Sequence, residues 1–362
     1  MTSAGSDSAP VVWLSGGPRA RGRGHGEALR EQIATRLERA RADLARGRGT
    51  DLARLDRDLE RLLDGTRFVA AITRWAPGLL AEIDGIAEGA GIARLDALTL
   101  NLMDELAWLQ AGGEVDDSCS SLAIPAPGGW LAGQTMDLEG GYDGSQAILR
   151  IEQEHGDALV LTSAGMVGLC GLNRDSVAIF CNQLMSLRTS TSGLPVAAVV
   201  RGALARPSFA SAREFLAKIE HASGQNYLLA GPEQAVNLEC SAGGVRECPV
   251  GGEAIWHTNH PLASGDVEVA EAGRSGFSAN SAERFAFLSA RVPEARSRED
   301  LQAILSDRGV PICKLPGPDG RQLTFGALVV ALSDPPRAWI APGPSDRTPW
   351  AEFDLSEPGP AR

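Results

Sequence analysis

The first third of the chain repeats apolar residues at intervals of three and four positions, the spacing of amphipathic helices. This spacing predicts helices over residues 29–44, 52–62, 79–90 and 98–109. Pro77 precedes the third of these segments and Gly91 follows it, which are typical start and stop signals of a helix. The Arg-rich polar positions between the apolar ones are expected to be solvated helix faces with internal ion pairs.

Beyond residue 112 the pattern changes to short apolar runs bounded by turn residues, which indicate strands. Strands are expected at 121–125, 130–134, 148–154, 159–162, 177–181, 226–230, 235–240, 254–258, 325–332 and 338–340. Helices are expected at 196–204, 211–221, 282–290 and 299–305, the second of them opening with the capping box Ser211-x-x-Glu214. Strand-rich runs flanked by helices on both sides predict sheets with helical outer layers.

Composition narrows the class of protein. With 362 residues, 43% hydrophobic and 22% charged, the chain is ordinary for a globular protein, and its length suggests two or three domains or one large layered domain. The net charge of −12 and the aromatic content of 5% argue against nucleic-acid binding, which uses cations and stacking rings. No signal peptide and no apolar run of about 18 residues is visible, so we expect no membrane association and a cytoplasmic protein with reduced cysteines.

Two short motifs suggest ligands only weakly. Gly22-x-Gly24-x-Gly26 departs from the dinucleotide-binding spacing and is followed by helical segments, so a glycine-rich turn into a helix is the simpler interpretation. His257 and His260 could form a metal pair, but residues three apart on a strand point to opposite faces. We therefore expect neither a cofactor nor a metal.

Cys119 lies where the helical third meets the strand-rich remainder, and three interpretations of it are open. It could be an ordinary thiol of a polar loop. It could be a papain-like nucleophile, because His257 follows at an interval usual for that class, although the C-G-S-C-W signature is absent and Asn259 lies too close to His257 to orient it independently. It could also be an N-terminal nucleophile, released when the Ser118–Cys119 bond is cut.

A series of motifs in one order favours the third interpretation. The series runs Asp117-Ser118-Cys119-Ser120, Gly133-Gln134-Thr135-Met136-Asp137, Gly171-Leu172-Asn173, Cys181-Asn182, Gly193-Leu194-Pro195, Leu238-Glu239-Cys240-Ser241 and His257-Thr258-Asn259-His260. Each motif is weak alone, but their order resembles the isopenicillin N acyltransferase-like family of cysteine N-terminal nucleophile hydrolases, over nearly the whole chain.

The resemblance implies an α+β fold, a four-layer αββα sandwich. Residues 1–118 would be a helical N-terminal segment that becomes the α chain, and residues 119–362 the β chain, together one layered domain. The Cys119 thiol would attack the Ser118 carbonyl, and the α-amine released on Cys119 would serve as the base. An α-amine has a pKa of about 8, so a useful fraction is unprotonated near neutral pH.

The resemblance also implies roles for Asp137 and Asn259. Asp137 would hold the new α-amine, and its main-chain N–H would assist the oxyanion hole. Asn259 would supply the side-chain amide of that hole, where a fixed N–H stabilises the developing charge. Structural alternatives remain open: Asp137 could cap a turn before Glu139, and Asn259 could satisfy buried backbone groups.

Four further residues are expected to line the substrate site. Arg321 matches a pocket arginine, although it could also be a surface charge, and Ser121 matches a hydroxyl position two residues after the nucleophile. Asn182 and Ser241 lie in motifs of the series.

Departures from the family pattern limit what the resemblance implies about substrate. Ser118 stands where relatives often have glycine, and Thr135-Met136 and Gly320 also differ, so the penicillin substrate is not carried over. The expected function is a self-processing amidohydrolase acting on a small N-acyl amine or amide through a Cys119 thioester. The alternatives are an acyltransferase with an amine acceptor and an unprocessed, inactive binding protein. The expected partner, apart from substrate, is the protein's own cleaved N-terminal chain.

Overall fold

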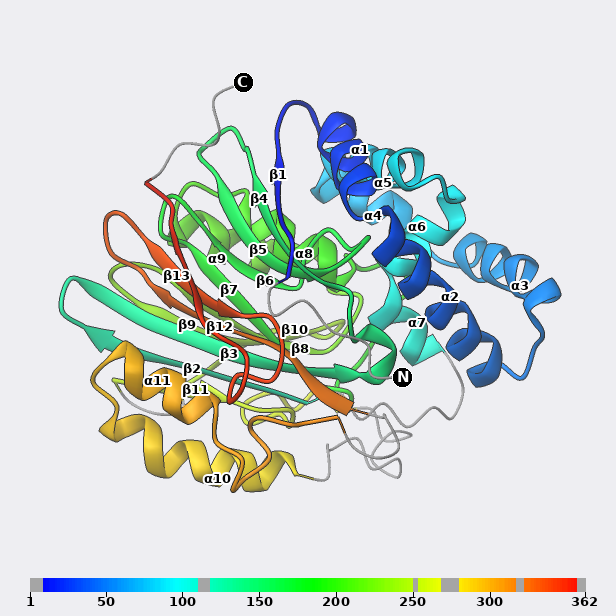
Figure 1. The fold of residues 1–362 in the computed structure, drawn as a ribbon. Helices are drawn as coiled ribbons and strands as arrows, with labels where there is room; N and C mark the ends of the chain where they lie inside the picture. Colours follow the sequence, from blue (N-terminus) through cyan, green and yellow to red (C-terminus); the bar gives the residue numbers. More distant parts are fainter. Residues whose placement is uncertain (1–8, 110–117, 250–252, 268–279, 317–321, 357–362) are drawn as a thin grey trace.

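Two β-sheets stack face to face at the centre of the computed structural model (Figure 1). The structure describes residues 9–109, 118–249, 253–267, 280–316 and 322–356. The first sheet has eight strands: β1 (Val11–Leu14), β4 (Gln146–Ile151), β5 (Ala158–Ser163), β6 (Cys170–Asn173), β7 (Ala178–Gln183), β8 (Gln225–Ala230), β9 (Ala235–Ser241) and β10 (Gly244–Cys248). The second has six strands: β11 (Ile255–His257), β2 (Ser118–Ala126), β3 (Gly129–Glu139), β12 (Gln322–Ala331), β13 (Arg337–Ala341) and β14 (Ala351–Asp354). Each list follows the order of the strands in the sheet.

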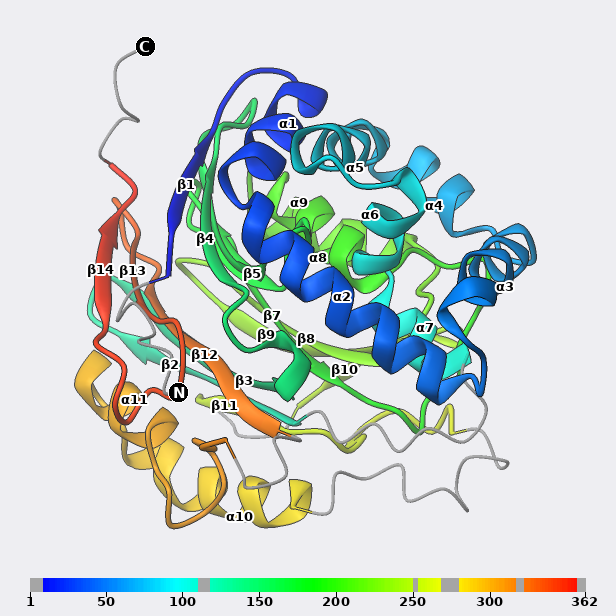
Figure 2. The ribbon, with the colours of Figure 1, turned by 45° about the vertical axis from the view of Figure 1, so that its right-hand side comes forward.

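Helices cover the outer face of each sheet (Figures 1 and 2). On the side of the first sheet lie α1 (Pro18–Ala28), α2 (Arg30–Gly47), α3 (Leu52–Asp64), α4 (Phe68–Trp75), α5 (Pro77–Ala90), α6 (Arg94–Leu100), α7 (Met103–Leu109), α8 (Val196–Leu204) and α9 (Phe209–Lys218). On the side of the second lie α10 (Ser281–Arg291) and α11 (Arg298–Leu305). Short 3₁₀ turns occur at Gly140–Tyr142 and Val292–Glu294. The expected four-layer αββα sandwich is therefore confirmed.

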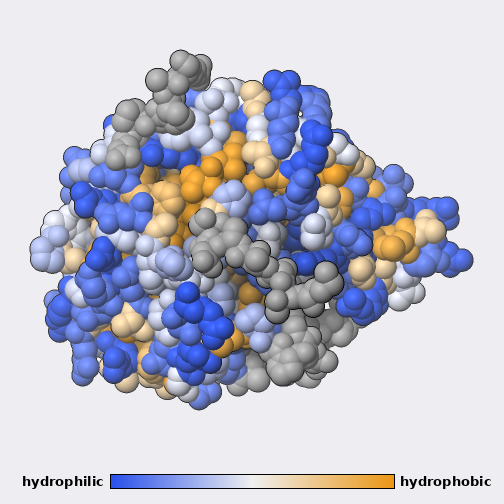
Figure 3. Space-filling model, viewed as in Figure 1, coloured by the Kyte–Doolittle hydropathy of each residue, from blue (hydrophilic) through white to orange (hydrophobic). Residues whose placement is uncertain are grey.

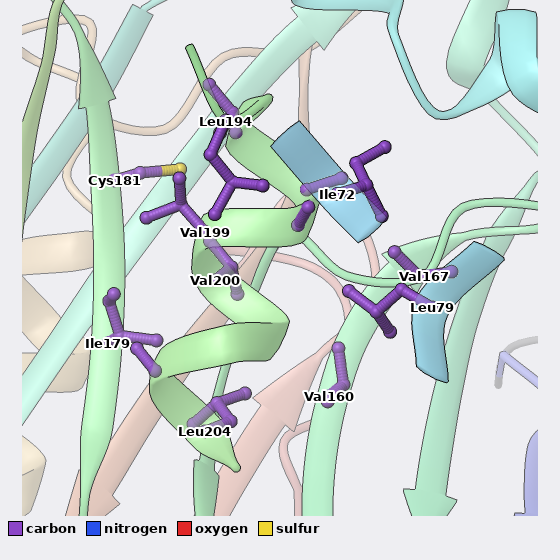
Figure 4. Packing of buried hydrophobic residues seen from close by; sticks show 14 of the residues in the cluster. Ile72, Leu79, Val160, Val167, Ile179, Cys181, Leu194, Val199, Val200 and Leu204 are labelled. Atoms are coloured by element: carbon purple, nitrogen blue, oxygen red, sulfur yellow. The ribbon is translucent and has the colours of Figure 1, made fainter. Parts of the chain in front are cut away.

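Strand β5 in the middle of the first sheet is apolar on both faces because each face is buried. In β5, Leu159 and Leu161 pack between the two sheets, whereas Val160 packs against the outer helices. This double burial explains why the strand reads as a continuous apolar run rather than an alternating one. In Figure 4, Val199 and Val200 of α8 pack near Ile72 of α4, so the leading segment and the later chain share one core.

Most of the helices expected from periodicity are confirmed, with three differences. The expected helix 98–109 is two helices, α6 and α7, with Asn101 and Leu102 between them. Helix α4 and strand β1 were not expected, and β1 pairs in parallel with β4, far away in sequence. The capping box at Ser211 is wrong, because α9 begins at Phe209 and the Ser208 side chain accepts the N–H of Ser211.

The expected strands are present, but three others had not been predicted: β6, β10 and β14. Strands β10 and β14 are edge strands with exposed residues, so they lack the apolar pattern of the central strands. The face of the molecule in Figure 3 is mostly hydrophilic, with apolar side chains gathered near its middle. Among the described residues, no helix has both the length and the apolar character needed to cross a membrane.

Glycines allow α1 and α5 to cross at close range. The interpretation of Gly22 and Gly26 as part of a turn is wrong, because both lie inside α1. A Cβ atom at Gly22 would lie 1.8 Å from the Glu82 oxygen, and one at Gly89 would lie 2.1 Å from the Arg23 oxygen. Side chains here would force the helices apart, so the glycine spacing reflects backbone contact between two helices.

Candidate active site

Cys119 is the second residue of β2, and its side chain points into the space between the two sheets. It is 6% exposed and lies in the apolar cluster that includes Met136, its neighbour across the strand pair, and Cys170. Burial raises the pKa of the Cys170 thiol, so that residue is a packing thiol rather than a nucleophile. All six cysteines are buried and none forms a disulfide.

The backbone of Cys119 is held on both sides by side chains from the far end of the chain. Its amide N–H donates to Asn259 Oδ1 at 2.8 Å, and its carbonyl accepts from Arg284 Nη1 at 2.7 Å. Arg284 is fully buried and also donates to Asn259 Oδ1 at 2.9 Å. The two side chains therefore fix each other as well as the backbone of Cys119.

Asn259 presents its carbonyl oxygen, not its N–H, to Cys119. Its Nδ2 donates to the main-chain oxygen of Gln183 at 3.1 Å. With the Ser118–Cys119 peptide bond intact, Asn259 thus satisfies buried backbone groups, which is the alternative that the sequence had left open.

Asp137 lies across the strand pair from Ser118, the residue on the other side of the expected cut. Its carboxylate accepts from the Ser118 hydroxyl at 3.0 Å and from the Thr324 hydroxyl at 2.6 Å. Lys314 Nζ lies 3.7 Å from Asp137 and donates to the Ser118 hydroxyl. Burial raises the pKa of Asp137, although the Lys314 charge opposes this. Asp137 lies within β3, so the turn-cap alternative is wrong.

Ser121 and Asn182 meet between the sheets, two residues beyond the nucleophile. The Ser121 hydroxyl donates to Asn182 Oδ1 at 2.7 Å, and Asn226 Nδ2 donates to the same oxygen at 3.0 Å. Asn182 Nδ2 is buried without a hydrogen-bond partner. These two expected residues therefore contact each other, and Ser121 lies on the same face of β2 as Cys119.

The other two expected substrate residues are not joined to this group. The Ser241 hydroxyl donates to Asp266 Oδ2 at 2.6 Å, at the end of β9. Arg321 lies outside the described residues, as does Gly320. The structure thus brings together Cys119, Asn259 and Asp137 with Ser121 and Asn182.

His257 is not arranged as a papain-like base. Its Nδ1 lies 2.8 Å from the Thr258 carbonyl and its Nε2 lies 3.0 Å from Glu239 Oε1, so both ring nitrogens have other partners. His260 instead contacts the Ser281 hydroxyl at 2.7 Å. The two histidines therefore do not form the metal pair considered from the sequence.

One group of three possible metal ligands occurs among the described residues: Glu239, Cys248 and His257, with donor atoms within 4.8 Å of one another. The Glu239 carboxylate already accepts from His257 and from three backbone N–H groups of the loop at 262–264. Burial alone would raise the pKa of Glu239, but these donors hold it below its usual value. The group therefore fits a loop anchor better than a cation site.

Sequence reasoning missed Arg284, which no motif singled out. Arg284 lies on the buried side of α10, four residues before Leu288 and three after Ser281, both buried. A charged residue on the apolar face of an expected helix was the available signal, because such a residue requires a buried partner.

Comparisons with known proteins identify the family of this chain. Residues 129–340 match the family model described as acyl-coenzyme A:6-aminopenicillanic acid acyl-transferase. The 40 kDa form of the acyl-coenzyme A:6-aminopenicillanic-acid-acyltransferase from Emericella nidulans is 28% identical over 260 residues, which cover 69% of each chain.

Two similar solved structures are more distant. A variant of the conjugated bile acid hydrolase from Clostridium perfringens has a TM-score of 0.48 and 14% identity, covering 67% of this chain and 93% of its own. Penicillin V acylase from Agrobacterium tumefaciens has a TM-score of 0.42 and 12% identity, covering 66% and 86%.

The family model spans more than half of the chain, and it includes Asp137 and Asn259. The chain therefore belongs to the acyl-coenzyme A:6-aminopenicillanic acid acyl-transferase family, and it is an enzyme built as an αββα sandwich.

Proposed function

We propose that this enzyme cuts itself between Ser118 and Cys119 and then hydrolyses the amide bond of a small N-acyl compound. Membership of an acyl-transferase family supports chemistry on acyl groups. The observation that carries the proposal is the framing of one peptide bond: Asp137 holds the residue before it, and Asn259 contacts the N–H of the residue after it.

The cut proceeds as an N-to-S acyl shift. The Cys119 sulfur attacks the Ser118 carbonyl carbon, the carbon–nitrogen bond breaks, and the nitrogen takes up the thiol proton to become an amine. Water then hydrolyses the thioester, which leaves a carboxylate on Ser118 and a free thiol on Cys119. Ser118 is held during this step through its hydroxyl, which donates to Asp137 and accepts from Lys314.

In the mature enzyme, the α-amine of Cys119 takes the thiol proton, since its pKa of about 8 leaves part of it neutral. The sulfur attacks the substrate carbonyl, the amine product leaves with a proton, and water releases the acid. The oxyanion role of Asn259 requires its Nδ2 to exchange the Gln183 carbonyl for the substrate oxyanion. Asp137 would hold the new amine once the Ser118 hydroxyl has left it.

Both products of the cut remain together in this proposal. Strand β1 of the leading segment pairs with β4, and Glu82 of α5 forms a buried ion pair with Arg201 of α8. Apolar residues of α2 and α5 belong to the same core cluster as α8 and α9. The cleaved leading chain is therefore a permanent partner of the chain that begins at Cys119.

Intact mass under denaturing conditions tests the cut. We expect the purified protein to give two chains, residues 1–118 and 119–362, and Cys119→Ala to give one inactive chain. Cys240→Ala is the matched control, because Cys240 is a buried thiol of the outer core and should be dispensable for the cut. A wild-type protein that stays in one piece and still hydrolyses N-acyl amines would refute the mechanism.

Acyl transfer to an amine is the second candidate, because the relative from Emericella nidulans is named as an acyltransferase. A primary amine or hydroxylamine added to a turnover reaction would then yield a new conjugate. Release of free acid alone, at high amine concentration, would count against transfer. The alternative of an inactive binding protein is not carried further, since family membership identifies an enzyme.

A further inference from the structure

Helix α7, the last described element before β2, carries two acidic side chains that the proposed mechanism does not use. Glu105 is 2% exposed, and its Oε1 accepts from the Val196 N–H at 2.9 Å and the Ser223 hydroxyl at 3.4 Å. Asp104 accepts from Gln225 Nε2 at 3.4 Å. Among the described residues, no Lys, Arg or His lies within ion-pair distance of the buried Glu105 carboxyl group or of the half-buried Asp104 carboxyl group, which is unusual for acids removed from water.

An unpartnered amide lies beside them. Gln183 is 7% exposed, and neither its Oε1 nor its Nε2 has a hydrogen-bond partner within the part of the chain that the structure describes. It stands directly opposite Gln225 in the β7–β8 pair, so the two side chains share a face of the sheet, and Gln225 contacts Asp104. Leaving both ends of a buried amide unpaired is costly, so this position calls for a ligand with polar groups.

A half-buried aromatic side chain completes the group. Trp108 lies four residues after Asp104, on the same face of α7, and its Nε1 donates to the sulfur of Met185 just beyond β7. The indole ring therefore bridges α7 and the segment just after β7, on the face of α7 that carries Asp104. Carboxylate oxygens beside an indole face are the surroundings that bind organic cations. We call Asp104, Glu105, Gln183 and Trp108 the α7 acidic cluster.

Gln183 connects the cluster to Asn259, the side chain that contacts the Cys119 backbone. The main-chain oxygen of Gln183 accepts from Asn259 Nδ2, and Asn259 Oδ1 accepts the N–H of Cys119. The neighbouring side chain, Asn182, contacts Ser121 on the inner face of the sheet. Side chains alternate along a strand, so the Gln183 side chain and the cluster lie on the outer face of the first sheet, and a substrate with its carbonyl at Cys119 would reach them around the end of β7.

We propose that the α7 acidic cluster is a subsite for a positively charged group of the substrate, a primary ammonium carried by the N-acyl compound. This rests on the proposed function of Cys119 and adds the class of substrate to it. Burial raises the pKa of Asp104 to about 6 and that of Glu105 to about 8, the latter also because Asp104 lies beside it. Near neutral pH the pair therefore keeps one proton and offers a single negative charge to a monovalent cation.

Matched substrates test the subsite on the mature, two-chain enzyme. Each pair shares one amide bond and differs only in a terminal group, an ammonium or a neutral methyl of similar size, placed on the acyl side in one pair and on the amine side in another. We expect kcat/KM to favour the ammonium member of one pair by about tenfold or more, the value of a charge-assisted hydrogen bond. In Asp104→Asn the ratio should fall toward one, while Glu214→Gln, an exposed acid of α9, should keep it.

Several outcomes would overturn the proposal while leaving the proposed function intact. These are a wild-type enzyme that is cut and active but shows no preference in either pair, or an Asp104→Asn enzyme that keeps the wild-type ratio. If Asp104→Asn does not fold, Gln183→Leu is measured in its place and should also lower the ratio.

A binding readout separates failure of the subsite from failure of the mechanism. Butylammonium chloride should raise the Tm of the uncut Cys119→Ala protein above its value in sodium chloride of equal ionic strength. It should not raise the Tm of Cys119→Ala/Asp104→Asn. Equal behaviour of the two proteins would refute the subsite, whatever the outcome for cleavage and turnover.

Discussion

A buried ion pair between Glu82 and Arg201 joins the leading helices to the part of the chain that follows Cys119. Arg201 Nη1 lies 2.6 Å from Glu82 Oε1, and Nη2 lies 3.1 Å from Oε2. Arg201 Nη1 also donates to the Val167 carbonyl at 2.9 Å. The exposed fractions are 0% for Glu82 and 3% for Arg201. Burial alone would raise the pKa of Glu82, but Arg201 holds it below its usual value.

Replacing Arg201 by methionine keeps most of the apolar stem and removes the charge. Removing one partner of a buried pair typically costs about 3–5 kcal/mol, because the other charge stays buried. Arg21 remains at 3.5 Å from Glu82, so we expect Arg201→Met to lose about 3 kcal/mol of unfolding free energy, the lower end of that range. The double variant Glu82→Met/Arg201→Met removes both charges, and it should lose less than the single variant.

Urea unfolding followed by circular dichroism measures these differences. The variants are made in the Cys119→Ala background, so that every protein is one uncut chain and the free energies are comparable. Arg213→Met, which removes an exposed ion pair with Glu247, is the matched control and should change stability by less than about 1 kcal/mol. A loss below about 1 kcal/mol for Arg201→Met would refute the reasoning. So would a loss in the double variant as large as the summed losses of the single variants Arg201→Met and Glu82→Met.

Three further predictions follow from the same structure. Gly89→Ala places a Cβ atom 2.1 Å from a backbone oxygen of α1, so it should force α1 and α5 apart and lower the Tm by several degrees; an unchanged Tm would show that the helices do not touch there. Arg284→Met leaves the buried Cys119 carbonyl without its donor and should slow the appearance of two chains in a mass-spectrometric time course by about tenfold or more, whereas Arg284→Lys should retain part of the rate; cutting at the wild-type rate in Arg284→Met would contradict this role. Burial raises the folded-state pKa of Glu105 to about 8, so the stability that this group contributes is complete below its unfolded pKa near 4.5 and is lost as the pH rises through 8. The Tm of Glu105→Gln should therefore rise relative to that of the wild type between about pH 5 and pH 9, and a constant difference would count against this prediction.

Local patterns in the sequence were sufficient for most of the fold. Helix α8 is found at the expected residues, and α5 begins at Pro77 and ends before Gly91, whose φ of 72° requires the left-handed conformation that glycine adopts readily. These features depend on residues within one or two helical turns of each other. The strand β10 was missed because its pattern reflects an exposed edge, which only the sheet order reveals.

The candidate site was predicted less completely. The order of motifs pointed to Cys119, Asp137 and Asn259, and the structure brings Asp137 and Asn259 to opposite ends of the Ser118–Cys119 peptide bond. Their chemical roles stay predictions until the cut is observed. Arg284 was missed, since its contact with Cys119 spans 165 residues and no spacing rule connects them.

The sequence by itself determined most helices and the central strands, because periodicity and caps are properties of neighbouring residues, and it predicts Cys119 as the nucleophile. Only the tertiary structure decided that β1 pairs with β4, that glycines of α1 and α5 meet the backbone of the other helix, and that Gln183 lies opposite Gln225, which contacts Asp104. The physical reason is burial: a charge or an amide reveals its importance only when the fold removes water from it and supplies, or withholds, a partner.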